Sequence, residues 1–348
     1  MATGNATGTR QATTIWALWR NRNYLLLWSG QAVSVIGTQL SQLAFPLLVL
    51  ALTGSAAQAG FLGAARTIPY MLLGLPAGAL VDRWNRKRLM MLCDAGRAVL
   101  LASIPLALAL GRLSLAQLYA VALGEGAFNV FFSLANTAGL VRVVPKEQLP
   151  VALAADEVTQ SSGYTLGPAL GGVLFSLSRA LPFLGDAISY AISVATLGLI
   201  SVKLNEERPP GRGKLRAEIG EGLRWLWRQP LLRFLAALVG GGLLVESGYL
   251  LVVIVLVQRM GGSDAAVGLV LAVGGVGSVI GGLAAAPMVR RFTFGQITLA
   301  VHWLWALTVL LYAVAPTPAV VGIITAVAFG TSPVFLVAQF SYRLSLIP

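Results

Sequence analysis

The sequence predicts an all-α membrane protein, and three observations support this. Of 348 residues, 57% are hydrophobic and only 11% are charged, and the mean hydropathy is +0.79. A soluble domain carries roughly a quarter of its residues as charged ones. Apolar runs of about 20 residues, long enough to cross a bilayer as a helix, recur along the chain. Lys and Arg gather in the short segments between these runs.

Ten runs reach the length of a membrane-spanning helix, and short turn-like joints rich in Gly, Ser and Pro separate several of them. The expected helices lie at 24–51, 57–81, 89–110, 114–138, 150–177, 181–202, 232–257, 264–288, 297–315 and 319–342.

The basic residues predict the orientation of these helices. Most of the 25 Lys and Arg residues fall on one side of the predicted membrane, whereas the opposite loops hold only Arg112, Arg179 and Arg259. Cytoplasmic loops carry the excess of Lys and Arg in membrane proteins. We therefore expect a multi-pass protein of the cell membrane with both termini in the cytoplasm.

The chain reads as two related halves. A shift of 208 positions places Gly54, Gly60 and Gly74 on Gly262, Gly268 and Gly282. Internal repeats of this kind are typical of transporter folds. We expect a cytoplasmic tail at 1–22, a six-helix bundle at 23–203, a cytoplasmic linker at 204–229 and a C-terminal bundle at 230–348. The repeat also predicts that this last bundle, with four helices, is incomplete by about 60 residues.

The linker predicts an amphipathic helix on the inner membrane surface. Leu215, Ile219, Leu223 and Leu226 fall at helical spacing among basic residues, as in helices that lie in the membrane interface. A bare solvated linker is the alternative.

Composition excludes several classes of site. The single cysteine, Cys93, and the single histidine, His302, argue against an internal disulfide, a metal site and a membrane-embedded enzyme. We expect no cofactor and a monomer in contact with membrane lipids. The net charge of +12 is explained by topology, so no nucleic-acid partner is expected.

The first predicted helix carries polar side chains along one side, at spacings of three and four residues. Lipid does not tolerate such a stripe, so it faces protein or water. We expect it to line a central cavity, with ordinary hydrogen bonding between helices as the alternative. The stripe consists of Gln31, Ser34, Thr38, Ser41 and Gln42.

Charged residues inside a bilayer are costly and suggest function. Arg66, Glu125 and Glu246 lie well inside predicted helices, and Asn129 follows Glu125 by one turn. The repeat maps Glu246 onto Thr38, so Glu246 is the first candidate for a proton-carrying acid and Glu125 the second. A structural pairing of either acid with Arg66 is the alternative.

For other charged residues we expect structural roles. Asp94 and Arg97 are three residues apart on one helix and read as a structural pair. Asp186 lies toward the outer end of its predicted helix. His302 maps by the repeat onto Asp94, and we do not expect it to bind substrate or protons.

Two motifs resemble a known family. Residues 78–88, GALVDRWNRKR, are similar to the signature loop of the major facilitator superfamily, and residues 163–172, GYTLGPALGG, resemble its exporter-associated motif. The surrounding sequence is similar to the macrolide-efflux and enterobactin-exporter-like branch. The resemblance implies twelve helices in two bundles, of which ten are present here, and alternating access to a central cavity. It also implies proton-driven export of small amphiphilic, drug-like or macrolide-like molecules.

The resemblance assigns roles within both motifs. In the loop, Gly78 is expected to let helices approach and Asp82 to accept hydrogen bonds from a neighbouring helix, which together would gate the cavity. The loop bases Arg83, Arg86, Lys87 and Arg88 are expected to bind lipid headgroups or acids, although a plain positive-inside loop also explains them. The second motif predicts close helix packing and a kink rather than substrate contact, through Gly163, Gly167, Pro168, Gly171 and Gly172.

A second class of function remains open from the sequence. A chain lacking its last two helices could insert in the membrane without transporting, as a sensor, an assembly partner or an inactive fragment. The reading frame beyond residue 348 would discriminate between these possibilities.

Overall fold

The computed structural model describes residues 18–202, 204–205, 220, 224 and 227–346. The described part is helical, with no strand. Its long helices coincide with the ten predicted ranges to within a few residues. They are α2 (Arg22–Thr53), α3 (Ala56–Val81), α4 (Arg86–Ala109), α5 (Leu115–Val143), α6 (Leu149–Leu177), α7 (Leu181–Leu199), α9 (Pro230–Arg259), α10 (Asp264–Arg291), α11 (Phe294–Ala313) and α12 (Pro318–Leu346).

Seven of the described helices, α2, α4, α5, α7, α10, α11 and α12, are long and apolar enough to cross a membrane. Helix α6 carries a polar run at 156–162 that lowers its hydropathy. The presence of ten out of twelve transmembrane helices therefore stays a prediction.

Side chains at the helix starts explain where the helices begin. Ser55 accepts a hydrogen bond from the backbone N–H of Gln58 at the start of α3, and Ser263 does the same for Ala266 at the start of α10. Such caps satisfy N–H groups that have no partner within the helix. Gly54 follows α2 in the left-handed conformation (φ 66°), which only glycine adopts without strain.

The helix bounds carry the predicted repeat. The first residues of α2, α3 and α4 precede those of α9, α10 and α11 by 208 positions each (22 to 230, 56 to 264, 86 to 294), and α5 precedes α12 by 203 (115 to 318). Ser55 and Ser263 are also related by 208 positions. The chain is thus built from two pseudo-symmetric helix bundles.

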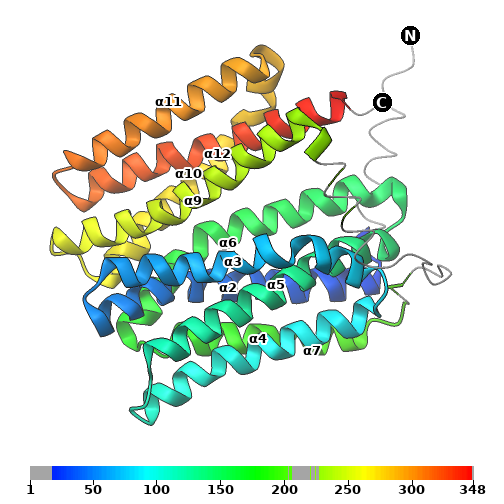
Figure 1. The fold of residues 1–348 in the computed structure, drawn as a ribbon, viewed down its shortest axis with the longest axis horizontal. Coiled ribbons are helices and arrows are strands. Elements are labelled where there is room, and N and C mark those ends of the chain that lie inside the picture. Colours follow the sequence, from blue (N-terminus) through cyan, green and yellow to red (C-terminus); the bar gives the residue numbers. More distant parts are fainter. Residues whose placement is uncertain (1–17, 203, 206–219, 221–223, 225–226, 347–348) are drawn as a thin grey trace.

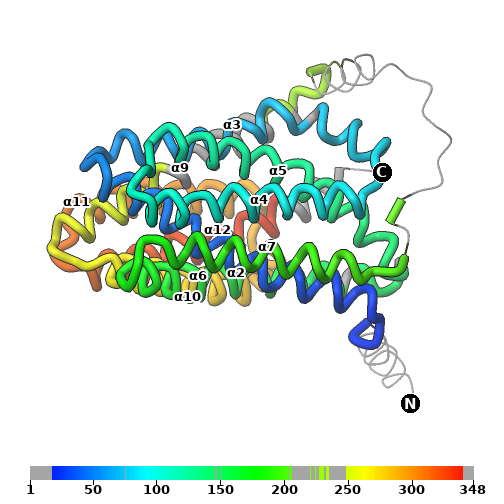
Figure 2. Tube along the Cα trace, turned by 90° about the horizontal axis from the view of Figure 1, so that it is seen from below, coloured from blue at the N-terminus to red at the C-terminus, as the bar shows by residue number. Residues whose placement is uncertain are grey.

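The two bundles lie side by side with their helices along a common axis (Figures 1 and 2). Helices α2 to α7 form one bundle, in which α2 packs on α7 and α6, α3 on α5, and α4 on α7. In the second, α12 packs between α10 and α11. The bundles meet chiefly where α6 contacts α10, and also where α3 contacts α9.

Among the described residues, the buried apolar clusters join the two bundles at one end. One core cluster contains residues of both halves, among them Leu47, Leu62, Val257 and Leu271. It lies toward the turns at 54–55, 110–114 and 260–263. At the opposite end each half has its own core, one around Met90 and Phe132 and another around Ile297 and Val334.

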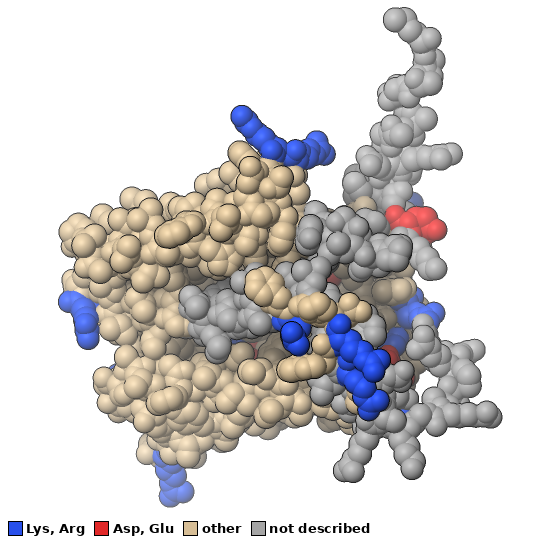
Figure 3. All heavy atoms as spheres, turned by 45° about the horizontal axis from the view of Figure 1, so that its top comes forward, with Lys and Arg blue, Asp and Glu red and all other residues tan. Residues whose placement is uncertain are grey.

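The surface agrees with a membrane location. Figure 3 shows a broad face with few charged residues. Large apolar side chains such as Met71 and Leu283 are each 79% exposed, as lipid-facing residues are. The predicted amphipathic helix, with Leu215, Ile219, Leu223 and Leu226, lies outside the described residues.

Candidate functional site

A cavity of about 590 Å³ lies between the bundles. Its described walls come from α2, α3, α4, α5 and α6 of the first half and from α9 of the second. Cavities of this size accommodate drug-sized molecules. Seven residues singled out from the sequence line it: Gln31, Ser34, Thr38, Gln42, Arg66, Glu125 and Asn129.

The polar stripe of α2 lines the cavity and also forms hydrogen bonds to a neighbouring helix. Gln31, Ser34 and Thr38 line the cavity. The same stripe also hydrogen-bonds to α7, because Gln31 Nε2 donates to Ser193 Oγ at 3.4 Å and the Thr38 hydroxyl lies 2.8 Å from the Tyr190 hydroxyl. The Thr38 hydroxyl also donates to the Ser34 carbonyl (2.9 Å), so Tyr190 is the donor in the contact with Thr38.

Arg66 and Glu125 form the ion pair that the sequence left as an alternative. Arg66 Nε and Nη2 each donate to one oxygen of Glu125 at 2.6 Å. Only 3% of the Glu125 side chain and 19% of the Arg66 side chain are exposed. Their helices pack closely, since a Cβ at Gly126 would overlap the Arg66 carbonyl. Nearby, Asn129 donates to the hydroxyl of Tyr70, which also lines the cavity.

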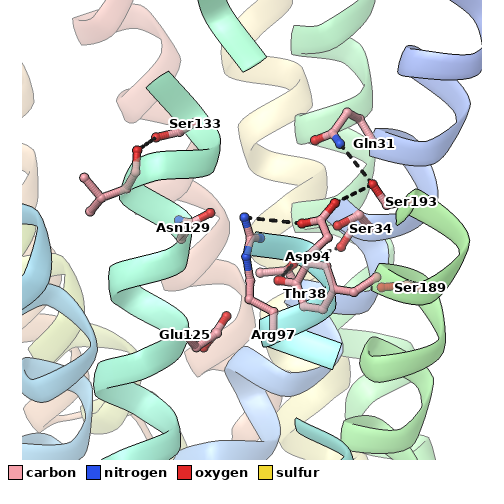
Figure 4. Close-up of polar contacts among 12 residues, drawn as sticks. Gln31, Ser34, Thr38, Asp94, Arg97, Glu125, Asn129, Ser133, Ser189 and Ser193 are labelled. Carbon is pink, nitrogen blue, oxygen red and sulfur yellow. Dashed lines mark hydrogen bonds and ion pairs between the residues drawn. The ribbon is translucent and has the colours of Figure 1, made fainter. Parts of the chain in front are cut away.

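A second charged pair lies on α4. Asp94 and Arg97 are 3.5 Å apart, as expected, and both are buried. Asp94 accepts a 2.6 Å hydrogen bond from Ser193. In Figure 4, Arg97 reaches toward the α5 residues Glu125 and Asn129, while Asp94 lies on the side of Ser193. Sequence reasoning missed that Arg97 lines the cavity.

Asp186 is a buried carboxylate whose described partners are hydroxyl groups. It is 0% exposed, accepts a hydrogen bond from Ser41 at 2.5 Å and lies 3.3 Å from the Ser189 hydroxyl. Asp186, Tyr190 and Ser193 recur every three or four residues along α7 and face the stripe of α2. The same periodicity that revealed the α2 stripe could have revealed this second one.

Two further residues were considered from the sequence, Glu246 and His302. The side chain of Glu246 is outside the described residues. His302 packs between Trp305 and Phe335, and its Nδ1 is 2.7 Å from the Thr298 carbonyl. Among the residues that the structure describes, no group of His, Cys, Asp and Glu is placed to hold a metal ion.

The signature loop contacts the end of α7. Arg86 pairs with Asp82 at 3.2 Å and also donates to the Leu204 carbonyl at 3.4 Å. Lys87 donates to the carbonyls of Gly198 (2.9 Å) and Ile200 (2.7 Å). These bases therefore satisfy carbonyls that a helix end leaves without partners.

The remaining loop positions are more open. Arg83 and Arg88 are exposed. A Cβ at Gly78 would meet no described heavy atom within 4 Å, so its expected close helix contact is not among those described.

The glycine motif of α6 lies between two helices. A Cβ at Gly163, Gly167 or Gly171 would meet α2, whereas one at Gly172 would meet the backbone of α10 at Gly268. Gly268 in turn lies against the carbonyl of Pro168, within the same motif. The motif thus packs α6 against both halves. Its glycines and Pro168 do not line the cavity, whereas Tyr164, within the same motif, does.

Comparisons with known proteins agree with this architecture. The chain is 31% identical over 319 residues to the multidrug efflux pump Tap of Mycolicibacterium fortuitum, covering 86% of this chain and 75% of that protein. It is 27% identical over 229 residues to macrolide efflux protein A of Streptococcus pyogenes, covering 64% and 55%. It resembles a crystal structure of the nucleoside transporter NupG with a TM-score of 0.70 at 13% identity, covering 93% and 84%.

The chain spans about half the length of several of its curated relatives, such as macrolide efflux protein A, and three quarters of the Mycolicibacterium pump. The profile of the Major Facilitator Superfamily matches residues 27–346, nearly the whole chain. The likeness to NupG supports the same fold. The protein therefore belongs to the major facilitator superfamily of membrane transporters.

Proposed function

We propose that the protein exports small amphiphilic molecules, drug-like or macrolide-like, from the cytoplasm by alternating access. The observation that carries this proposal is the cavity lined by both halves and closed at one end by their shared apolar core. At the other end the described residues of the two halves form separate cores. With the orientation predicted from Lys and Arg, this arrangement exposes the cavity to the cytoplasm.

The cavity lining fits an amphiphilic cargo. Phe45, Leu62 and Leu251 supply apolar surface, and Gln31 and Asn129 supply hydrogen-bonding groups. Pockets that bind drug-sized molecules combine apolar walls with a few polar groups in this way. The names of two relatives, a multidrug efflux pump and a macrolide efflux protein, favour the same substrate class.

Proton coupling is part of the proposal. Glu125 lies in the cavity wall and neutralises Arg66. If Glu125 takes up a proton, Arg66 loses its partner, and the balance of charge in the cavity changes. Glu246 remains the first candidate from the sequence for the same role. A charge change at a buried pair can bias one of two arrangements of the halves.

Inverted membrane vesicles provide the test, because the cytoplasmic face then points outward. An imposed acid-inside gradient should drive a neutral fluorescent amphiphile with hydrogen-bond acceptors, such as Nile red, into vesicles that contain the protein. A protonophore should abolish this uptake, and vesicles lacking the protein should show none. Uptake that is equal with and without the protein would refute export by this chain.

A further inference from the structure

Arg97 lies at the cavity wall between two aromatic rings. Its guanidinium carbon lies 4.6 Å from the centre of the Phe132 ring and 4.7 Å from that of Tyr190. Only 3% of the residue is exposed, yet it lines the cavity. The two rings hold the planar guanidinium and leave its edge, where the N–H groups point, for partners.

Two donor nitrogens of Arg97 lack acceptors in the described structure. Nε and Nη2 are buried and have no hydrogen-bond acceptor among the described atoms. The nearest carboxylate oxygen, Asp94 Oδ1, lies 3.5 Å from Nη2 and is itself without a hydrogen bond. Arg66 in the same cavity differs, since two 2.6 Å hydrogen bonds to Glu125 satisfy it. Buried donors of a charged group are costly to leave without an acceptor, so Nε and Nη2 of Arg97 call for one.

The charges around the cavity indicate which sign of charge this acceptor should carry. Three of the described lining residues are charged. Arg66 and Glu125 neutralise each other, which leaves Arg97 as the remaining charged residue. Asp94 does not line the cavity, and its second oxygen is engaged by Ser193. The pair on α4 therefore turns its cation toward the cavity and its anion away from it (Figure 4).

We propose that Arg97 forms a substrate subsite that binds a carboxylate or similar planar oxygen-acceptor group at the polar end of an amphiphile. A guanidinium edge binds such a group through two parallel hydrogen bonds. Asn129 and Gln31, which also line the cavity, lie within the same region as further hydrogen-bonding groups. This inference rests on the proposed export function and narrows its substrate class to amphiphiles with an acceptor-bearing rather than a cationic head.

The test measures binding of two probes to the purified protein in detergent. Dansyl-undecanoate carries a carboxylate, and its trimethylammonium analogue carries a cation on the same chain. Arg97→Gln should weaken binding of the carboxylate probe by about ten- to a hundredfold, the loss expected for hydrogen bonds to a charged group. Binding of the cationic probe should not weaken. Arg112→Gln, at an exposed arginine in the turn after α4, is the matched control and should change neither.

Asp94→Asn separates a binding role from a structural one. It removes the charge that competes for Arg97, so the carboxylate probe should bind more tightly, opposite to the effect of Arg97→Gln. If both substitutions weaken both probes alike, the pair is structural and the subsite is refuted. Gel filtration checks folding, and should Arg97→Gln aggregate, the direction of the Asp94→Asn effect alone decides. Binding needs no gradient, so the two proposals can fail separately. If the vesicles show no transport but the purified protein still distinguishes the two probes as expected, only the export proposal is refuted.

Discussion

Gly172 of α6 and Gly268 of α10 meet backbone to backbone across the two halves. A Cβ added to Gly172 would lie 2.9 Å from the Gly268 Cα, and one added to Gly268 would lie 3.0 Å from the Gly172 Cα. Both distances are shorter than an ordinary contact between carbon atoms. Small residues let membrane helices approach in this way. This contact lies between α6 and α10, the two helices through which the halves chiefly meet, and beside the cross-half apolar core.

Gly268→Ala should therefore destabilise the protein by about 1–3 kcal/mol, the usual result of overpacking a tight contact. Gly282→Ala is the matched control on the same helix, because a Cβ there meets no described heavy atom within 4 Å. It should be neutral or slightly stabilising, since alanine favours helix over glycine by about 1 kcal/mol. Thermal unfolding of the two purified variants measures the difference. Equal unfolding temperatures would show that the contact is looser than described.

The ion pair between Arg66 and Glu125 predicts how stability and export change when one or both of its charges are removed. Glu125→Gln leaves the Arg66 charge without compensation, which should cost about 3–5 kcal/mol of stability. The double substitution Arg66→Gln with Glu125→Gln removes both charges and should recover most of this loss. Export in inverted vesicles should fail in both, because the exchangeable charge is gone. Normal gradient-driven export by a folded double variant would exclude this pair from coupling.

The elements of this fold follow from features that are local in the sequence. A helix that crosses a membrane needs a long apolar run, so the positions of the ten long helices described could be predicted. The repeat could be detected because glycines recur at a constant offset along the chain. The ion pair of Arg66 with Glu125 was foreseeable because isolated charges in a bilayer need partners.

The contacts of the cavity wall depend instead on helix rotation. Arg97 and Asp94 are close in sequence and look like a self-contained pair, yet the rings of Phe132 and Tyr190 hold Arg97 at the cavity. Similarly, the contact of Lys87 with the end of α7 joins residues more than a hundred positions apart. Neither relationship leaves a periodic signal in the sequence.

The contact made by Lys87 predicts local stability at the end of α7. Lys87→Ala removes two hydrogen bonds to the carbonyls of Gly198 and Ile200. Hydrogen bonds to a charged group contribute about 1.5–3 kcal/mol, so amides at 198–202 should exchange with deuterium at least about tenfold faster. Arg88→Ala removes an equal charge from an exposed neighbour and is the control. Unchanged exchange in Lys87→Ala would show that the lysine does not hold this helix end.

The predicted orientation can be tested by labelling single cysteines in intact cells. Cys93 is buried, and Cys93→Ala provides a background without thiols. Arg88 and Arg112 are both exposed and lie at opposite ends of α4, so a cysteine at each position reports one side of the membrane. The excess of Lys and Arg around Arg88 predicts that it faces the cytoplasm. An impermeant maleimide should therefore label Arg112→Cys in intact cells and Arg88→Cys only after the cells are opened. The reverse pattern would invert the topology, and with it the assignment of the open end of the cavity to the cytoplasm.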